Sequence, residues 1–116
     1  MIEKIIDAFK KNFVGLDVRV KTGIGDVAGP EGYKLTAQKI GNSIEATITY
    51  KSEHAVRYAL NELLAFANGD KHELESESAP DFPVRGVVEG FYGKPWSHEQ
   101  RLRAIEQFGN FNFNTY

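Results

Sequence analysis

Cysteine is absent from this chain, and its apolar residues never gather into a long uninterrupted run. Without cysteine there are no disulfides, thiolate metal sites or cysteine nucleophiles, and the cellular compartment stays open. No segment approaches the roughly 20 apolar residues that cross a bilayer. The opening Met-Ile-Glu-Lys-Ile-Ile-Asp also lacks the hydrophobic stretch of a signal peptide. We therefore expect no membrane partner.

An excess of positive charge is also missing. The 14 basic residues are outnumbered by 16 acidic ones, which gives a net charge of -2. No cationic field is available to neutralise phosphates, so we expect no nucleic-acid partner. What the chain does have is 41% hydrophobic and 26% charged residues in 116 positions. That composition is ordinary for a globular protein with a real hydrophobic core.

The first two thirds of the sequence predict a helix, three strands and a second helix. Apolar residues recur every three or four positions in both predicted helices, and they alternate with polar residues in the strands. Gly41-Asn42 predicts a tight hairpin turn, and Ser52 is expected to cap the second helix with its side chain. The predicted elements are a helix over 2–13 ended by Gly15, a strand over 16–21, a loop over 22–32, hairpin strands over 33–37 and 44–50, and a helix from 55 to 67.

The segment from Asp70 to Pro83 predicts the boundary between two domains. Its acidic residues, prolines and serines favour an exposed acidic linker, although a short edge strand over His72–Ser76 is an alternative. A short apolar run over Val84–Val88, which predicts a buried strand, follows, then a helix opened by a Ser97–Gln100 capping box, and then an alternating run from Phe111. In the helix, Leu102, Ile105 and Phe108 are expected to share one face, with Gly109 ending it.

These elements predict an α+β fold with two parts. Residues 1–83 are expected to form a small helix-covered mixed or antiparallel sheet. Residues 84–116 read strand, helix, strand, which is the repeating unit of a β/α barrel. A closed barrel takes roughly 250 residues, so the second part would be only the first unit of a truncated barrel.

The string from Arg85 to Trp96 reads Arg-Gly-Val-Val-Glu-Gly-Phe-Tyr-Gly-Lys-Pro-Trp. It closely resembles the opening of the catalytic barrel in family 84 glycoside hydrolases, the β-N-acetylglucosaminidases that include protein O-GlcNAcases and enzymes long labelled hyaluronidases. The resemblance implies that Gly90, Phe91 and Tyr92 line the pocket for an N-acetylglucosamine ring. A glycine suits this role because the backbone can then approach a sugar hydroxyl closely. The implied partner is a glycan or glycoprotein that carries N-acetylglucosamine.

The resemblance also implies a mechanism and a role for the first part. Residues 1–83 resemble the non-catalytic accessory domain that precedes the barrel in such enzymes. In the family, the 2-acetamido oxygen of the sugar attacks the anomeric carbon, and two neighbouring aspartates orient it and transfer protons. The five aspartates of this chain are never adjacent, and none follows Val84. We therefore expect no catalytic residue, metal or cofactor here and no hydrolysis by this polypeptide.

Several residues have more than one interpretation. Glu89 is interpreted as a supporting carboxylate, held by hydrogen bonds or by a cation such as Arg85. Phe91, Tyr92 and Trp96 could stack on a sugar or fill the barrel mouth. The histidines lack a second metal-type ligand at helical spacing and are interpreted as surface residues. For the chain as a whole, the alternative is a carbohydrate-binding or interaction module without chemistry.

Overall fold

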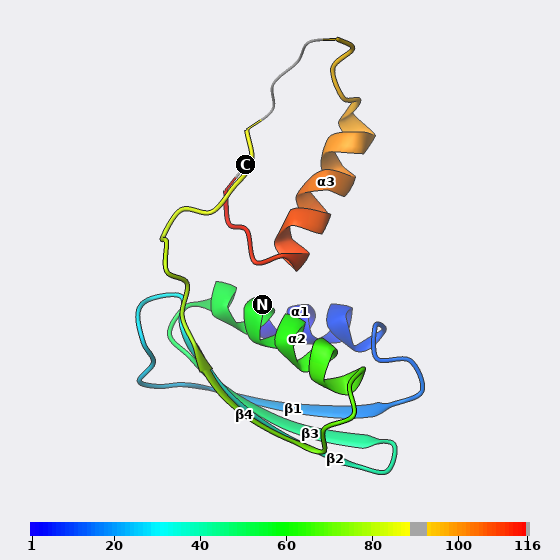
Figure 1. Cartoon of the computed structure of the whole chain (residues 1–116), viewed down its shortest axis with the longest axis vertical. Helices are drawn as coiled ribbons and strands as arrows, with labels where there is room; N and C mark the ends of the chain where they lie inside the picture. The colour runs from blue at the N-terminus through cyan, green and yellow to red at the C-terminus, as the bar shows by residue number, and fades with distance from the viewer. Residues whose placement is uncertain (89–92, 116) are drawn as a thin grey trace. The chain divides into compact units, whose positions relative to one another are not determined.

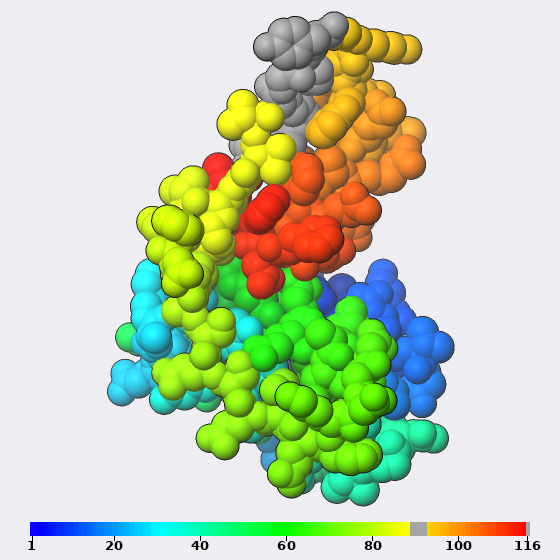
Figure 2. Space-filling view, viewed as in Figure 1, coloured from blue at the N-terminus to red at the C-terminus, as the bar shows by residue number. Residues whose placement is uncertain are grey.

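The computed structural model describes residues 1–88 and 93–115, and these form two compact units, Met1–Pro80 and Asp81–Tyr116. Figure 1 shows the elements of each unit, and Figure 2 shows the same units in space-filling form. The units are called unit 1 and unit 2 below, and each is described by itself. No helix in the described ranges has the length and apolar content needed to span a membrane.

Unit 1 is a four-stranded mixed sheet covered on one face by two helices (Figure 1). The strand order is β1-β3-β2-β4, with β1 parallel to β3 and the other pairs antiparallel. This arrangement confirms the predicted α+β fold with a helix-covered mixed sheet. The elements are α1 (Ile2–Lys10), β1 (Asp17–Ile24), β2 (Tyr33–Ile40), β3 (Ser43–Tyr50), α2 (Glu53–Ala67) and β4 (Glu73–Ser78).

The core of unit 1 lies between the sheet and the helices. Alternate residues of β2 and β3 face inward, and Leu35, Ile44 and Ile48 are fully buried. Leu60 and Leu63 of α2 meet them from the other side, and α1 adds Ile6 and Phe9. Burying each such side chain contributes about 1.5–3 kcal/mol, so the core is the main stabilising feature of this unit.

The predicted hairpin is confirmed. Ile40 pairs with Ser43, which leaves the two-residue loop Gly41-Asn42. Gly41 has a φ of 59°, in the left-handed region. A glycine with positive φ at the first loop position is typical of the type II′ turns whose twist matches the strands. The turn residue thus fixes the register that places the alternating apolar residues inside.

Four local predictions in unit 1 need correction. The first helix ends at Lys10 and not at Gly15, because the Asn12 and Phe13 amides after it donate to the carbonyls three residues back, at 2.9 and 3.1 Å. β1 continues to Ile24, so the loop begins later than Thr22, because parallel pairing with β3 extends to Tyr50. Ser52 is the N-cap residue of α2, but its side chain makes no capping hydrogen bond. The acidic segment is not a linker throughout: its alternative, an edge strand, is realised as β4, which pairs with β2.

Unit 2 contains α3 (His98–Asn110) and one isolated parallel bridge between Gly86 and Thr115. The predicted capping box is present: Ser97 Oγ accepts from the Gln100 amide at 3.2 Å, and Gln100 Oε1 accepts from the Ser97 amide at 2.8 Å. The helix runs one residue past Gly109, because Asn112 and not the glycine adopts the left-handed conformation, with φ 64°.

The C-terminus of α3 is a Schellman motif. The Phe113 amide donates to Phe108 O at 3.0 Å, and the Asn112 amide donates to Gly109 O at 3.1 Å. The rings of Phe108 and Phe113 supply the accompanying apolar contact, with centroids 5.9 Å apart. This turn reverses the chain so that residues 113–115 run back beside the segment that precedes the helix.

The predicted burial in unit 2 is wrong. Val84 and Val88 are 69% and 94% exposed, and α3 has no buried residue. Leu102 and Ile105 are 54% and 46% exposed, whereas Phe108 is half-buried. A short parallel strand becomes buried only when neighbouring strands and helices cover both of its faces. The apolar pattern of residues 84–88 therefore does not produce a buried strand within unit 2.

Candidate functional site

The residues predicted to contact a sugar, Gly90, Phe91 and Tyr92, lie outside the described residues, as does Glu89. Their predicted roles stay predictions. The structure describes the segments on either side, which end at Val88 and resume at Gly93. The candidate site is therefore defined here by the framework of residues 82–88 and 112–115.

Backbone hydrogen bonds join the two arms of this framework. The amides of Asn114 and Thr115 donate to Arg85 O at 2.8 and 2.9 Å, and the Val87 amide donates to Thr115 O at 3.2 Å. A Cβ added at Gly86 would lie 2.2 Å from Thr115 O, closer than any real side chain approaches a backbone atom. Glycine is thus required at position 86 for the two arms to run side by side.

The side chain of Asn114 extends this pairing where the backbone has no partner. Its Oδ1 accepts from the Arg85 amide at 2.9 Å, and its Nδ2 donates to Pro83 O at 2.7 Å. The Thr115 hydroxyl donates to the same Oδ1 at 2.8 Å. One amide side chain therefore satisfies a donor and an acceptor of the neighbouring arm, as an additional strand residue would.

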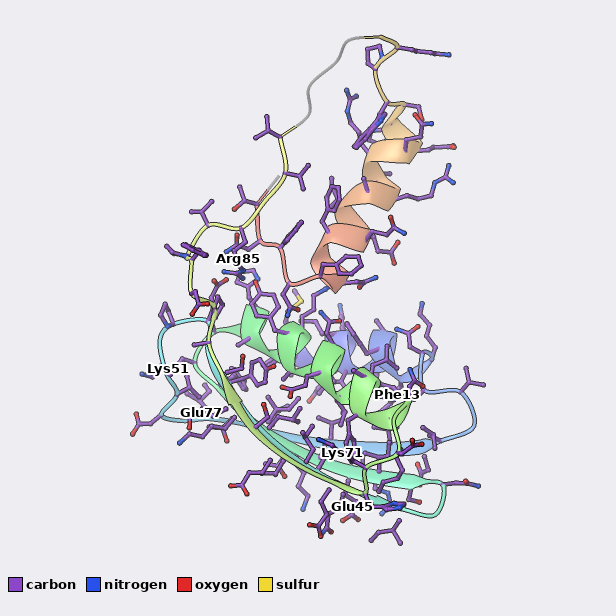
Figure 3. All side chains as sticks on the ribbon, in the orientation of Figure 1. Phe13, Glu45, Lys51, Lys71, Glu77 and Arg85 are labelled. Atoms are coloured by element: carbon purple, nitrogen blue, oxygen red, sulfur yellow. The ribbon has the colours of Figure 1, made fainter. Side chains whose placement is uncertain are left out.

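The guanidinium of Arg85 holds both arms together. Arg85 is labelled in Figure 3. Its Nε donates to Asn112 O at 2.9 Å, and its Nη1 donates to Phe82 O at 2.8 Å. These carbonyls belong to the approach from unit 1 and to the turn after α3. Charged donors make stronger hydrogen bonds than neutral ones, so Arg85 stabilises the framework. Its suggested pairing with Glu89 involves an undescribed residue and stays a prediction.

Sequence reasoning missed the roles of Asn112 and Asn114. The alternation of aromatic and polar residues from Phe111 to Thr115 predicts a strand. Only Thr115 forms a bridge in the structure, because the left-handed Asn112 belongs to the helix cap. Asparagine is a recognised residue at C′, the position just after a helix C-cap, where the backbone is often left-handed. The sequence therefore contained a signal for the role of Asn112 in ending α3. The Asn114 contacts are specific to the tertiary structure.

The described contacts of the framework hold the backbone of its two arms in place. Among the described residues, no three histidine, aspartate or glutamate side chains gather closely enough to hold a metal ion. Trp96 is half-exposed after the undescribed segment and presents an aromatic surface. Such a ring can stack on the apolar face of a sugar. In chemical terms, the described part of the site offers one exposed aromatic ring beside a hydrogen-bonded backbone framework.

Unit 1 has a separate cluster of polar side chains that holds the edge strand. Glu62 Oε1 on α2 accepts from the Tyr33 hydroxyl at 2.6 Å and from Ser76 Oγ at 2.9 Å. Burial, followed by the hydrogen bond from Tyr33 to the Glu62 carboxylate, raises the pKa of the Tyr33 hydroxyl. The cluster connects β2, β4 and α2, and every polar atom named here has a partner, so we interpret it as structural.

The comparison with known families concerns the second unit. Residues 85–116 match the NAGidase family model, described as beta-N-acetylglucosaminidase. The match begins at Arg85, the residue whose backbone and side chain organise the framework. It covers a short stretch of the chain and supports a relationship of that stretch to glycosidases of the β-N-acetylglucosaminidase type.

Proposed function

We propose that this chain is the N-terminal part of a retaining, substrate-assisted β-N-acetylglucosaminidase or hyaluronidase-like enzyme, related to family 84, that acts on N-acetylhexosaminides. The observation that carries the proposal is that the family match over residues 85–116 covers both sides of the parallel Gly86–Thr115 bridge and the helix between them, α3. The sugar pocket of the parent would include Gly90, Phe91 and Tyr92. Its partners would be glycans or glycoproteins that carry N-acetylglucosamine.

The parallel pairing in unit 2 supports a barrel origin. Two parallel segments joined through a helix form a crossover, which is the connection that parallel sheets need. Exposed apolar side chains lie on both parts of this crossover, Val84 and Val88 on either side of the Gly86 bridge and Leu102 and Ile105 on α3. In a β/α barrel, adjacent strands and helices cover such positions. We interpret these residues as contacts for further barrel units.

Unit 1 takes the role of the accessory domain in this proposal. Its hydrophobic core is complete without unit 2, since the buried cluster draws only on residues between Ile6 and Phe66. Among its described residues, no three histidine, aspartate or glutamate side chains gather closely enough to hold a metal ion. A structural or interaction role therefore suits it better than chemistry.

The polypeptide itself is proposed to be inactive. Substrate-assisted hydrolysis needs an acid at the glycosidic oxygen and a carboxylate that orients the acetamido group. Unit 2 contains a single aspartate, Asp81, and it precedes the stretch that matches the family, which begins at Arg85. The test is a 4-nitrophenyl N-acetyl-β-glucosaminide assay with the purified chain. Turnover above that of a buffer blank, retained after further purification, would refute the proposed inactivity.

Sugar binding tests the pocket independently of catalysis. The chain is titrated with N-acetylglucosamine while backbone amide signals are followed by NMR, with glucose as the control that lacks the acetamido group. Saturable shifts centred on residues 90–96, seen with N-acetylglucosamine only, would favour a binding module that acts without chemistry. The absence of any response would favour an incomplete pocket that needs the rest of a barrel.

A further inference from the structure

The face of the unit 1 sheet opposite α1 and α2 carries a regular pattern of charge. Strand alternation directs one set of side chains toward this face, and Glu45 in Figure 3 marks it. A broad hollow of about 720 Å³ lies over its centre. The side chains around this hollow include Arg19 and Lys21 from β1, Thr36 and Gln38 from β2, Glu45 and Thr47 from β3, and Glu73 and Glu75 from β4.

The strand register arranges these residues in two rows across the sheet. One row runs Arg19, Glu45, Gln38, Glu73, and the next runs Lys21, Thr47, Thr36, Glu75. Each row is therefore basic at the β1 edge and acidic at the β4 edge, with small or uncharged side chains between Lys21 and Glu75.

The charged residues at the two edges form few ion pairs within the unit, although Arg19 lies opposite Glu45 in the register. Arg19 lies 3.7 Å from Asp17, and both side chains are mostly exposed. Such a contact contributes about 0–1 kcal/mol. Within the described part of the chain, no ion pair is seen for Lys21, Glu73 or Glu75. The three glutamates of β4, Glu73, Glu75 and Glu77, also repel one another along a single edge.

We propose that this face binds the same face of a second copy of the chain. In this dimer the two-fold axis runs parallel to the strands, midway between the two facing sheets and level with the gap between β3 and β2. It places each row of one copy opposite the same row of the second copy, in reverse order. It places Arg19 opposite Glu73 of the second copy and Lys21 opposite Glu75, twice in each dimer. Thr47 then faces Thr36 at the centre. A two-fold axis perpendicular to the strands would instead place like charges together, so the charge pattern selects one orientation.

The geometry suits an aligned sheet-on-sheet packing. Two twisted sheets pack about 10 Å apart with strands within about 30° of each other, which a small tilt of the axis provides. Four strands at about 4.8 Å spacing and six residues at about 3.3 Å rise cover roughly 400 Å² per copy. That is at the low end for specific interfaces, so we expect a weak dimer.

Charge reversal tests the proposal. Arg19→Glu with Lys21→Glu makes both edges acidic, and Glu73→Lys with Glu75→Lys makes both edges basic. We expect each double variant to be monomeric in sedimentation equilibrium at 0.5 mM and low salt, where the natural chain associates. Mixing the two variants is expected to restore a dimer, as is combining all four substitutions in one chain.

A matched control separates this contact from other association. Lys10→Glu with Lys11→Glu changes the net charge as much as the β1 variant does, but at exposed positions on and after α1. This variant is expected to associate like the natural chain. The proposal is overturned if the natural chain is monomeric at 0.5 mM in low salt. It is equally overturned if the β1 reversal leaves association unchanged, since unit 2 would then be the contact.

Discussion

Lys39 on β2 places its ammonium group at the C-terminus of α2. The substitution Lys39→Met tests how much this contact stabilises unit 1. Lys39 Nζ donates to Ala67 O at 3.0 Å and to Gly69 O at 2.9 Å, with a longer contact of 3.4 Å to Phe66 O. The ammonium also lies 5.3 Å from the centre of the Phe66 ring. Because α2 has no basic residue in its last turn, Lys39 is the cation that meets the negative end of the helix dipole.

The expected loss of stability follows from these contacts. Hydrogen bonds to a charged group contribute about 1.5–3 kcal/mol, and a cation at a helix C-terminus contributes about 0.3–1 kcal/mol. Lys39 is only half-buried, so solvent screening reduces both contributions. Methionine keeps most of the side-chain packing. We therefore expect Lys39→Met to lower the free energy of unfolding by about 2 kcal/mol, a shift of about 1–2 M in the urea midpoint.

The assay is urea unfolding followed by far-UV circular dichroism, with amide exchange at Asn68 and Gly69 as a local measurement. The control is Lys34→Met, which removes the same charge from an exposed position on the same strand. Its effect is expected to stay within about 0.5 kcal/mol. If the two variants have the same midpoint, or if the α2 end is equally protected in both, the capping argument is refuted.

Three further predictions concern the other contacts. Gly86→Ala is expected to abolish the amide protection of Val87, because the new Cβ would collide with the opposite arm, whereas Gly93→Ala, with open space around it, leaves that protection unchanged. Asn112→Val is expected to destabilise the end of α3 by about 1–2 kcal/mol, seen as faster amide exchange in its last turn, and Asn112→Gly is expected to leave it intact. The pKa of the Tyr33 hydroxyl is raised in the folded state, so its contribution to the free energy of unfolding is fully present below the unfolded pKa of about 10 and is lost as the pH rises above it. The urea midpoint is therefore expected to fall between pH 10 and 11.5, and to fall less in Tyr33→Phe.

Unit 1 could be predicted from the sequence because its signals are local and agree with one another. Alternation in β2 and β3, a glycine at the turn and a broad apolar stripe on α2 all require the same core. The acidic β4 was harder to predict, since its charges favour a linker as strongly as a strand. The deciding contacts are non-local: pairing with β2, and the hydrogen bond from Ser76 to Glu62.

Unit 2 shows where local signals stop being sufficient. Its capping box was predicted correctly because both partners lie within one turn of helix. The burial of Val84 and Val88 was predicted wrongly, because an apolar run indicates only that a residue can be buried, not that a neighbour is present to cover it. The Asn114 contacts could not be predicted from one sequence, since they depend on how the turn after α3 returns the chain to Arg85.

Different interactions therefore stabilise the interior of each unit, and this difference bears on the proposed pocket. Unit 1 is stabilised by a buried apolar cluster, whereas α3 has no buried residue and unit 2 depends on helix caps and on the polar contacts of Arg85 and Asn114. Exposed hydrogen bonds contribute about 0.5–1.5 kcal/mol each and open readily. A sugar pocket needs its backbone groups held to within about half an ångström. In the proposed enzyme, covering Val84, Val88, Leu102 and Ile105 with further barrel units would supply the burial that the polar framework of unit 2 does not provide.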